Sequence, residues 1–170
     1  MDVLQALREK RAIRVFRPEP IPDDVARAIL RAGRRAQSSK NTQPWQFIAV
    51  RERATLAALA DTGRYAAHLA GAALGVVIAT PDTARKFTIA FDSGQAAACM
   101  QLAAWELGVG SCLASLYDPD AVRALLGIPA EWHPHIALSF GYFDPAAQPP
   151  PGVREPGRKP LDEIVHWERW

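Results

Sequence analysis

The sequence predicts a single α+β domain in which helices pack on a small central sheet. Nearly half of its 170 residues are apolar, 49%, which is enough for a substantial core in one domain. Four short apolar segments alternate with helical patterns in the order helices, strand, helices, strand, helix, strand, helix, strand. This order shows no repeat and no second domain, and it favours an α+β or three-layer fold.

Two amphipathic helices are expected before the first strand. Asp2 can cap a helix that runs to about Lys10. Residues 21–24 indicate a second helix start, because a proline suits the first turn and two carboxylates lie at the positive end of the helix dipole. The buried stripe of this second helix would consist of Val25, Ile29 and Ala32.

The next part of the chain alternates strands with helical stretches. A run of small polar residues, 37–43, leads into a strand at 46–50. Helical stretches at 54–60 and about 64–72 then precede a second strand at 75–80. A surface turn needs only one or two polar residues, whereas a loop that binds a ligand rich in heteroatoms could use all of them, and the run itself leaves both interpretations open.

The most apolar helix is expected in the second half of the chain. Asp92-Ser93-Gly94 resembles a helix cap, and the helix would continue to residue 107, apolar nearly all round. Such a helix must be covered on every side, and a subunit interface is the expected cover. The remaining elements are a strand at 110–113, a helix at 118–127 capped by Asp118, and a strand at 135–140.

The chain is expected to divide into a core, residues 1–142, and a C-terminal arm, residues 143–170. Residues 143–160 hold six of the 14 prolines and should run extended. The tail that follows offers two tryptophans to an apolar surface. An arm of this length is expected to dock on a partner; the alternative is a tail folded back on its own domain.

Composition excludes several classes of protein. No apolar run reaches the ~18 to 20 residues of a membrane span, and no signal-peptide pattern opens the chain, so a cytoplasmic location is expected. Two cysteines, Cys99 and Cys112, are too few for a disulfide framework. The four histidines show no metal-ligand spacing on a predicted helix, so no metal site is expected.

Positive charge is concentrated near the N-terminus. The first forty residues contain ten of the 20 Lys and Arg residues but only five carboxylates. Lys10, Arg11 and Arg14 lie within five positions and could bind a phosphate through charge-assisted hydrogen bonds; the alternative is a solvated face, which basic clusters usually form. Arg158-Lys159 is a second basic pair, whereas the arginines of the second helix, at 27, 31 and 34, are interpreted as a solvated face.

No catalytic acid, base or nucleophile can be assigned from the pattern. The Gly108-Val109-Gly110 triplet follows a helix and precedes a strand, which is the reverse of a phosphate-binding turn. If the protein is an enzyme, a cofactor is therefore expected to supply the chemistry.

Four segments together resemble the nitroreductase family of FMN flavoproteins. They are KRAIRVF, SSKNTQPWQF, LGVGSCLASLYDPDAVRALLGIP and RKPLDEIVHWE, in the family's order and spacing. The resemblance implies an α+β homodimer with a small mixed sheet packed by helices and a C-terminal extension that wraps the partner subunit. It also implies two FMN sites at the interface and a ping-pong transfer of hydride from NADH or NADPH to nitroaromatics, quinones or similar acceptors.

The resemblance also implies roles for residues in four places. The N-terminal motif that holds the FMN phosphate, ribityl chain and pyrimidine edge corresponds to Lys10, Arg11 and Arg14. The loop that the other subunit lends to the same flavin corresponds to Ser38, Ser39, Asn41 and Gln43, with Lys40 beside the substrate. The segment whose backbone faces flavin N5 corresponds to Ala114, Ser115 and Leu116, and the C-terminal phosphate clamp to Arg158 and Lys159.

The chain departs from the family pattern at three places. Ala12, within the cofactor motif, stands where the family often has serine, and Gln37 replaces a common proline. Only PDTARKFTIAF separates the second strand from the long helix, where many relatives place a helical cover over the substrate. Arg64 and His68 lie where relatives often contact the flavin, without a motif that fixes their register.

Three functions are weighed on these observations. The first is an FMN-dependent NAD(P)H oxidoreductase of nitroreductase type. The second, kept open by the short segment before the long helix, is a protein of the same fold that stores, senses or delivers FMN. A nucleic-acid binder is disfavoured, because no recognition helix or aromatic-studded basic strand accompanies the charge.

Overall fold

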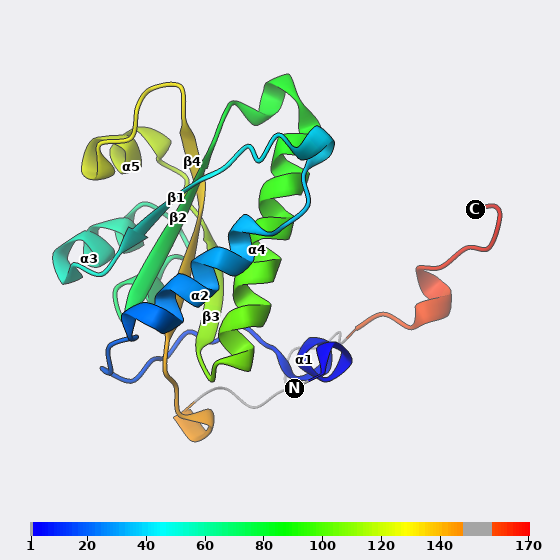
Figure 1. Cartoon of the computed structure of the whole chain (residues 1–170), viewed down its shortest axis with the longest axis horizontal. Helices are drawn as coiled ribbons and strands as arrows, with labels where there is room; N and C mark the ends of the chain where they lie inside the picture. Colours follow the sequence, from blue (N-terminus) through cyan, green and yellow to red (C-terminus); the bar gives the residue numbers. More distant parts are fainter. Residues whose placement is uncertain (1, 148–157) are drawn as a thin grey trace.

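The computed structural model describes residues 2–147 and 158–170 and contains a four-stranded antiparallel sheet with helices on both faces (Figure 1). The strand order is β1-β2-β4-β3. The strands are β1 (Gln46–Val50), β2 (Leu74–Thr80), β3 (Gly110–Ser115) and β4 (His133–Gly141). All four lie where the sequence predicts them, and the α+β class is confirmed.

Each face of the sheet has its own apolar core. On one face α2 (Asp23–Arg34) and α4 (Phe87–Glu106) cover Val76, Ile78, Leu138 and Phe140. On the other, α3 (Arg53–Asp61), α5 (Pro119–Leu126) and the 3-10 turn Ala67–Leu69 cover Val77 and Ala137. The alternation along β2 and β4 follows from the two-residue period of side chains in a strand.

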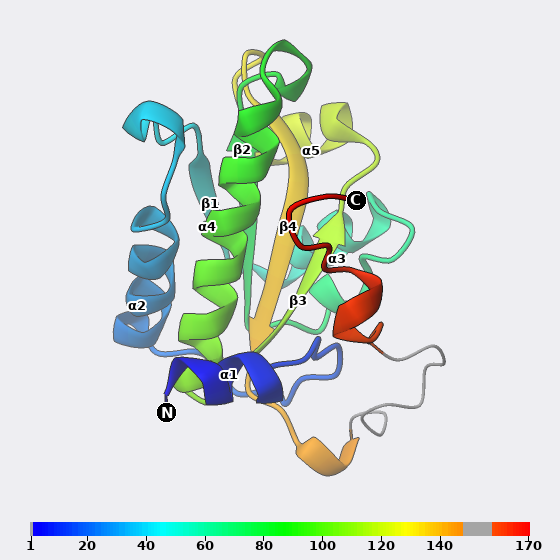
Figure 2. The ribbon, with the colours of Figure 1, turned by 90° about the vertical axis from the view of Figure 1, so that its right-hand side faces the viewer.

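The N-terminal segment closes one end of this sandwich. The short helix α1 (Val3–Glu9) lies across the C-terminal end of α4 (Figure 2). The chain then runs beside β3, where Ile13 N donates to Ser111 O at 2.9 Å and Ala12 forms a parallel bridge with Ser111. The mixed character expected of the sheet is therefore limited to this bridge.

The start of α4 differs from the sequence prediction. The helix begins at Phe87, so Asp92 is not its cap but a residue of its second turn, 3% exposed. The preceding turn is made by Thr83–Arg85, where the Asp82 side chain accepts from Ala84 N at 2.9 Å. A polar triplet ending in glycine resembled a cap locally, but the continuous helical pattern of the five residues before it extends the helix.

Two further predictions need correction, while the remaining helices agree within about two residues. The helical stretch expected at 64–72 forms only the 3-10 turn Ala67–Leu69, because so short a segment gains too few backbone bonds to offset helix nucleation. The buried residues of α2 are Ala26, Ile29 and Gly33, one position away from two of those expected. The caps expected at Asp2 and Asp118 are confirmed.

The C-terminal segment stands apart from the sandwich. Residues 158–170 lie away from the body of the molecule (Figure 1) and carry Trp167 and Trp170 at 81% and 101% exposure. Most of the proline-rich stretch lies outside the described residues. In the part of the chain that the structure describes, no helix is long and apolar enough to cross a lipid bilayer.

Candidate functional site

Beyond the bridge between Ala12 and Ser111, the outer edge of β3 carries backbone groups that no neighbouring strand of the described chain uses. Leu116 N donates to His135 O of β4 at 2.9 Å. Because backbone groups alternate in direction along an antiparallel ladder, the N–H of Ser115 points away from β4, toward the open edge. Of the expected trio Ala114, Ser115 and Leu116, Ser115 is thus the residue placed to donate to a ligand.

A cavity of about 870 Å³ lies near this edge. It is lined by Arg14, Arg64, Tyr65, Ala67 and His68. Gly63, which precedes this loop, packs directly on the end of β3, since a Cβ there would lie 2.3 Å from the Ser115 carbonyl oxygen. Only glycine permits that approach, and the loop is held further by Tyr117 N, which donates to Thr62 O at 2.8 Å. The structure therefore brings Arg64 and His68 into one site with Arg14.

His68 belongs to a buried hydrogen-bond chain. Its Nδ1 lies 2.7 Å from Ser139 Oγ, and Ser139 Oγ donates to Cys112 O at 3.3 Å. Since the serine proton is used for that carbonyl, Ser139 accepts from Nδ1–H, and Nε2 of the neutral ring carries a lone pair. Nε2 is buried and has no partner within the described chain.

The electrostatics favour this neutral form of His68. Burial, and secondly the Arg14 guanidinium, lower the pKa of His68 below its ordinary value. The ring therefore presents a hydrogen-bond acceptor in a cavity that a guanidinium group also lines, a combination that suits a ligand with both a donor group and an anionic group.

The basic cluster lies along the same edge of β3 but nearer its start, where Ala12 bridges Ser111. Burial raises the pKa of the Cys112 thiol, and the positive charges of Arg14 and Lys10 lower it by a smaller amount. Burial lowers the pKa of Lys10, which is half-buried. Arg11 is also half-buried, and its Nε is enclosed without a hydrogen-bond partner among the described residues. Lys10 and Arg11 are thus partly enclosed by the protein, whereas Arg14 is exposed at the cavity that it lines.

The polar loop that opens the first strand is held in an unusual backbone conformation. Lys40, Asn41 and Gln43 have φ values of 54°, 56° and 47°, in the left-handed region that non-glycine residues seldom adopt. Ser38 Oγ accepts from Gln43 N at 2.9 Å, which closes the loop on itself. The side chains of Lys40, Asn41 and Gln43 are exposed.

A buried carboxylate anchors this loop to α4. Asp92 Oδ2 accepts from Ser39 N at 3.0 Å across 53 positions of sequence. Sequence reasoning missed this residue because its neighbours resemble a helix cap. The available signal was a carboxylate on a helix whose other faces are apolar, which must find a partner once buried.

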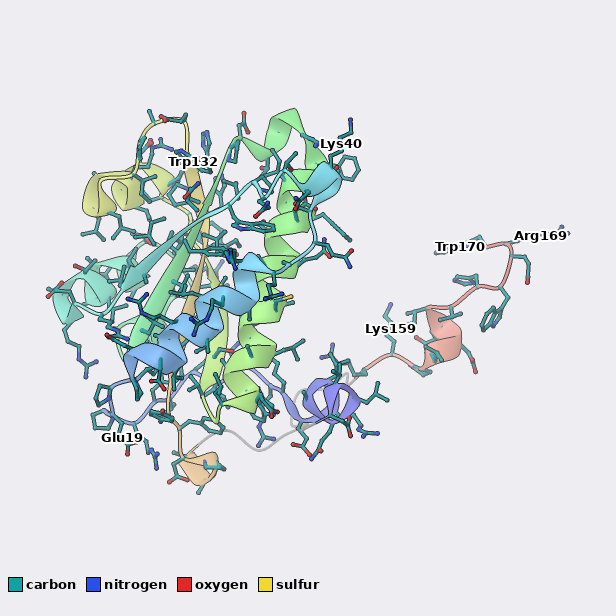
Figure 3. All side chains as sticks on the ribbon, viewed as in Figure 1. Glu19, Lys40, Trp132, Lys159, Arg169 and Trp170 are labelled. Carbon is teal, nitrogen blue, oxygen red and sulfur yellow. The ribbon has the colours of Figure 1, made fainter. Side chains whose placement is uncertain are left out.

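The polar loop and the basic cluster lie at opposite ends of α4. The loop is fixed at Asp92, whereas Val109 N bonds to Ala104 O just before the strand that contacts Ile13. Twelve residues at 1.5 Å each separate Asp92 from Ala104 by about 18 Å. Figure 3 shows Lys40 at the far end of the molecule from α1, and Lys159 on the detached C-terminal segment with Arg158 beside it in sequence. A single chain therefore does not bring all the expected flavin residues together.

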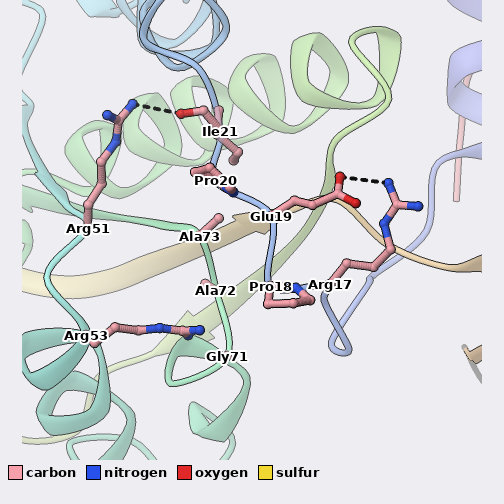
Figure 4. Close-up of a pocket in the computed structure, with 10 residues that line it drawn as sticks. All are labelled: Arg17, Pro18, Glu19, Pro20, Ile21, Arg51, Arg53, Gly71, Ala72 and Ala73. Atoms are coloured by element: carbon pink, nitrogen blue, oxygen red, sulfur yellow. Dashed lines mark hydrogen bonds and ion pairs between the residues drawn. The ribbon is translucent and has the colours of Figure 1, made fainter.

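A second cavity, of about 190 Å³, is lined by arginines that already bind other groups of the protein (Figure 4). Arg17 pairs with Glu19 at 3.0 Å, and Arg51 bonds Asp23 and the Ile21 carbonyl at 2.6 and 3.2 Å. Arg53 donates to a backbone carbonyl at 3.2 Å. The bonds of Arg51, which follows β1, hold the start of α2 against the sheet, so the role of this cavity is structural.

The connection from β2 to α4 is short. Six residues, 81–86, join the two elements, fewer than expected because FTIAF is part of the helix. At its end Phe87 and Phe91, one helical turn apart, are 82% and 69% exposed, on the part of α4 that contacts the polar loop. The surface beside this loop therefore offers two uncovered aromatic rings.

Comparisons with known proteins agree with this geometry. The family model described as the nitroreductase family matches residues 7–62 and 60–142. An NADH dehydrogenase of Thermus thermophilus is 29% identical over 206 residues, which cover 98% of this chain and 96% of that protein.

Solved structures show the same relationship. An FMN-dependent nitroreductase from Clostridium difficile has a TM-score of 0.82 at 25% identity, covering 99% of this chain and 100% of the other. The NADPH:FMN oxidoreductase of Vibrio harveyi, complexed with NAD⁺, has the same fold, with a TM-score of 0.85 at 24% identity over 98% of this chain and 77% of that one. The resemblance read from four sequence segments is confirmed, and the chain belongs to the nitroreductase family.

Proposed function

We propose that the protein is an NAD(P)H-dependent oxidoreductase that binds FMN at the open edge of β3. The observation that carries this proposal is a cavity lined by Arg14 and by His68, whose Nε2 has no partner in the described chain, close to the outward-facing Ser115 N–H and to Lys10 and Arg11. FMN, when bound, supplies the chemistry by accepting a hydride from the nicotinamide and passing it to the acceptor.

The residues present suit FMN. The cavity volume lies within the range of roughly 300 to 1,000 Å³ that ligand pockets occupy. Lys10, Arg11 and Arg14 would hold the phosphate and the neighbouring ribityl chain, and the buried Nε of Arg11 would gain the partner it lacks. His68 Nε2 would accept from a ligand N–H or O–H, such as the N–H of the pyrimidine edge, and Ser115 N–H would face flavin N5.

A homodimer is part of the proposal. Support comes from the position of the polar loop and the basic cluster at opposite ends of α4, where Asp92 and Ala104 are about 18 Å apart. A two-fold partner would bridge this distance by placing its own loop at the first subunit's cavity. The exposed tryptophans and the Arg158-Lys159 pair on the detached segment support an arm that wraps the partner. The division into a core of 1–142 and an arm of 143–170, and a cytoplasmic location, stay predictions of the sequence.

We propose aromatic acceptors, nitroaromatics or quinones, reduced in a ping-pong cycle. Phe87 and Phe91 support a flat apolar acceptor, since exposed aromatic rings beside the polar loop offer stacking surface. The short 81–86 connection contains no α-helix that could cover this region and so leaves it accessible to such an acceptor. In the proposed cycle, donor and acceptor occupy the same flavin face in turn. Parallel double-reciprocal plots are expected, and intersecting plots would show a ternary complex and contradict this cycle.

Absorption spectroscopy of the purified protein tests the function directly. A yellow protein is expected, bleached without oxygen by NADH or NADPH and recoloured by a quinone or a nitroaromatic. Protein that neither contains nor takes up FMN would refute the proposal. Flavin that binds but is reduced by neither nicotinamide would favour the second candidate, FMN storage or sensing, which the uncovered site also allows.

A further inference from the structure

A third cavity, here called the α2 groove, lies between the outer face of α2 and the edge strand β1. Its volume is about 580 Å³. The lining residues are Arg27, Leu30, Arg31, Arg34, Gln43, Trp45, Gln46 and Phe47. The sequence pattern alone favours a solvated helix face for the three arginines, but the structure makes them one wall of this groove.

The guanidinium groups of the three arginines in the α2 groove are available to bind a ligand. Arg27, Arg31 and Arg34 recur at i, i+4 and i+7, which places them on one side of the helix. None of them forms an ion pair or a side-chain hydrogen bond with another residue of the described chain. The contrast is the cavity of Figure 4, where Arg17 and Arg51 are each paired.

The opposite wall of the α2 groove is polar with an aromatic floor. Gln43 supplies an amide whose oxygen can accept and whose nitrogen donates to Asn41 O at 3.5 Å. Gln46 also lines the groove, although its side chain alternates to the other face of β1 from those of Trp45 and Phe47. Trp45 and Phe47 are stacked with ring centroids 6.1 Å apart and an interplanar angle of 7°. A wall of guanidinium forks facing amides and rings suits a ligand that joins a phosphate monoester to a polar heterocycle.

We propose that the α2 groove binds the adenosine 2′-phosphate end of NADPH. This inference rests on the proposed function and makes NADPH the preferred electron donor. Gln43 connects the two sites, because it lines the groove and also belongs to the loop assigned to the partner's flavin. The subunit that lends its loop to a flavin would thus also hold the far end of the nicotinamide cofactor. The 2′-phosphate is the group that NADH lacks, and it is the natural counter-ion for Arg27, Arg31 and Arg34.

Calorimetric titration of the full-length protein with 2′-AMP tests the binding without any flavin turnover. We expect 2′-AMP to bind more tightly than 5′-AMP, adenosine or inorganic phosphate. Arg31→Gln should weaken 2′-AMP binding about 10- to 150-fold, the range for one hydrogen-bonded charged partner. The matched control is Arg35→Gln, which removes the same charge just past the end of the same helix but outside the groove.

Three results would overturn the proposal. Equal affinity for 2′-AMP and inorganic phosphate would indicate a general anion site, and equal weakening by Arg35→Gln would indicate surface charge alone. A single-stranded oligonucleotide that binds more tightly than 2′-AMP, with the same dependence on Arg31, would assign the groove to nucleic acid instead.

Steady-state kinetics separate this inference from the function on which it rests. Arg31→Gln should lower kcat/KM for NADPH at least 10-fold more than kcat/KM for NADH. An unchanged ratio would overturn the assignment of the groove even in an active enzyme. A protein that binds 2′-AMP in the groove, but whose FMN is reduced by neither nicotinamide, would contradict the proposed activity. The nucleotide site would still be supported.

Discussion

The cavity around Arg14 and the polar loop at 38–43 are built in different ways. The cavity rests on the sheet, and His68 is fixed there through Ser139 to the backbone of β3. The loop has three residues in the left-handed region and is tied to the body by one buried carboxylate, Asp92. One half of the proposed site is therefore stabilised by many contacts of the core, and the other depends on a few. Variants in the two halves should behave differently.

The largest expected effect comes from combining damage to the two halves. Arg14→Ala and Asn41→Ala homodimers should each be nearly inactive if the flavin site takes Arg14 from one subunit and Asn41 from the other. Co-refolding the two variants should give half mixed dimers, each with one intact and one doubly damaged site. Roughly a quarter of all sites should then regain activity.

The control for this experiment is independent proof of subunit exchange, by pull-down with a tag on one variant. Mixed dimers that form but recover no activity would show that both residues serve a site within one chain, and would refute the shared site.

The next effect isolates the cavity half. Arg14→Ala should weaken FMN binding about 10- to 150-fold, because a hydrogen bond to a charged group contributes about 1.5 to 3 kcal/mol. FMN titration by fluorescence quenching measures it. Arg17→Ala removes a nearby guanidinium that pairs with Glu19 outside the cavity, and it should change the affinity little. If FMN and riboflavin bind the wild type equally well, the cluster does not hold phosphate.

A smaller effect is expected in the loop half. Asp92→Ala should lower the free energy of unfolding by about 1 to 3 kcal/mol, because Ser39 N–H loses its partner. Asp92→Asn, whose amide oxygen can still accept, should lose less. Denaturant unfolding measures the free energy of unfolding, and FMN titration measures the affinity that depends on the position of the loop. Ser93→Ala, which removes a bond only to Ala90 of the same helix, is the matched control; an equal loss of FMN affinity in that variant would argue against the anchor.

The smallest effect is a change in pH dependence. Burial lowers the folded-state pKa of His68, so the unfolded chain takes up the proton first as the pH falls below about 6.5. The stability present above that pH should therefore decline on acidification, with a slope of at most about 1.4 kcal/mol per pH unit from this one group.

His68→Asn keeps a donor for Ser139 and removes the titration, so the flavin-free variant should show a flatter decline in stability between pH 7 and pH 5. The pKa of His135 is lowered as well, chiefly by burial, so His135→Asn gives the background from the other shifted histidine. A His68→Asn profile that parallels the wild type would show that His68 is not the titrating group.

The sequence predicted the parts of the molecule that local patterns determine. The four strands follow from apolar segments with turn signals around them, and Asp2 and Asp118 cap helices as their positions indicate. The basic motif was recognisable because its cations are close together in sequence. Asp92 was wrongly predicted to be a helix cap because its hydrogen-bond partner, Ser39 N–H, lies 53 positions away in the sequence.

The same limit applies to the contacts inside the cavity. The chain from His68 through Ser139 to Cys112 joins three distant segments, so no local window contains it. The direction of the Ser115 N–H depends on the register of β3 with β4, which becomes known only once the strands are paired. The α2 arginines were assigned to solvent because the sequence does not place the edge of β1 opposite them.

The length of α4 has a genetic consequence if the proposed dimer is correct. A helix of 20 residues holds the two half-sites of one chain too far apart to meet, so every subunit contributes to both sites of its dimer. A subunit carrying Arg14→Ala and Asn41→Ala together would inactivate both sites of any dimer it enters. Expressed in equal amount with the wild type, it would leave roughly a quarter of dimers active, and the allele would be dominant-negative.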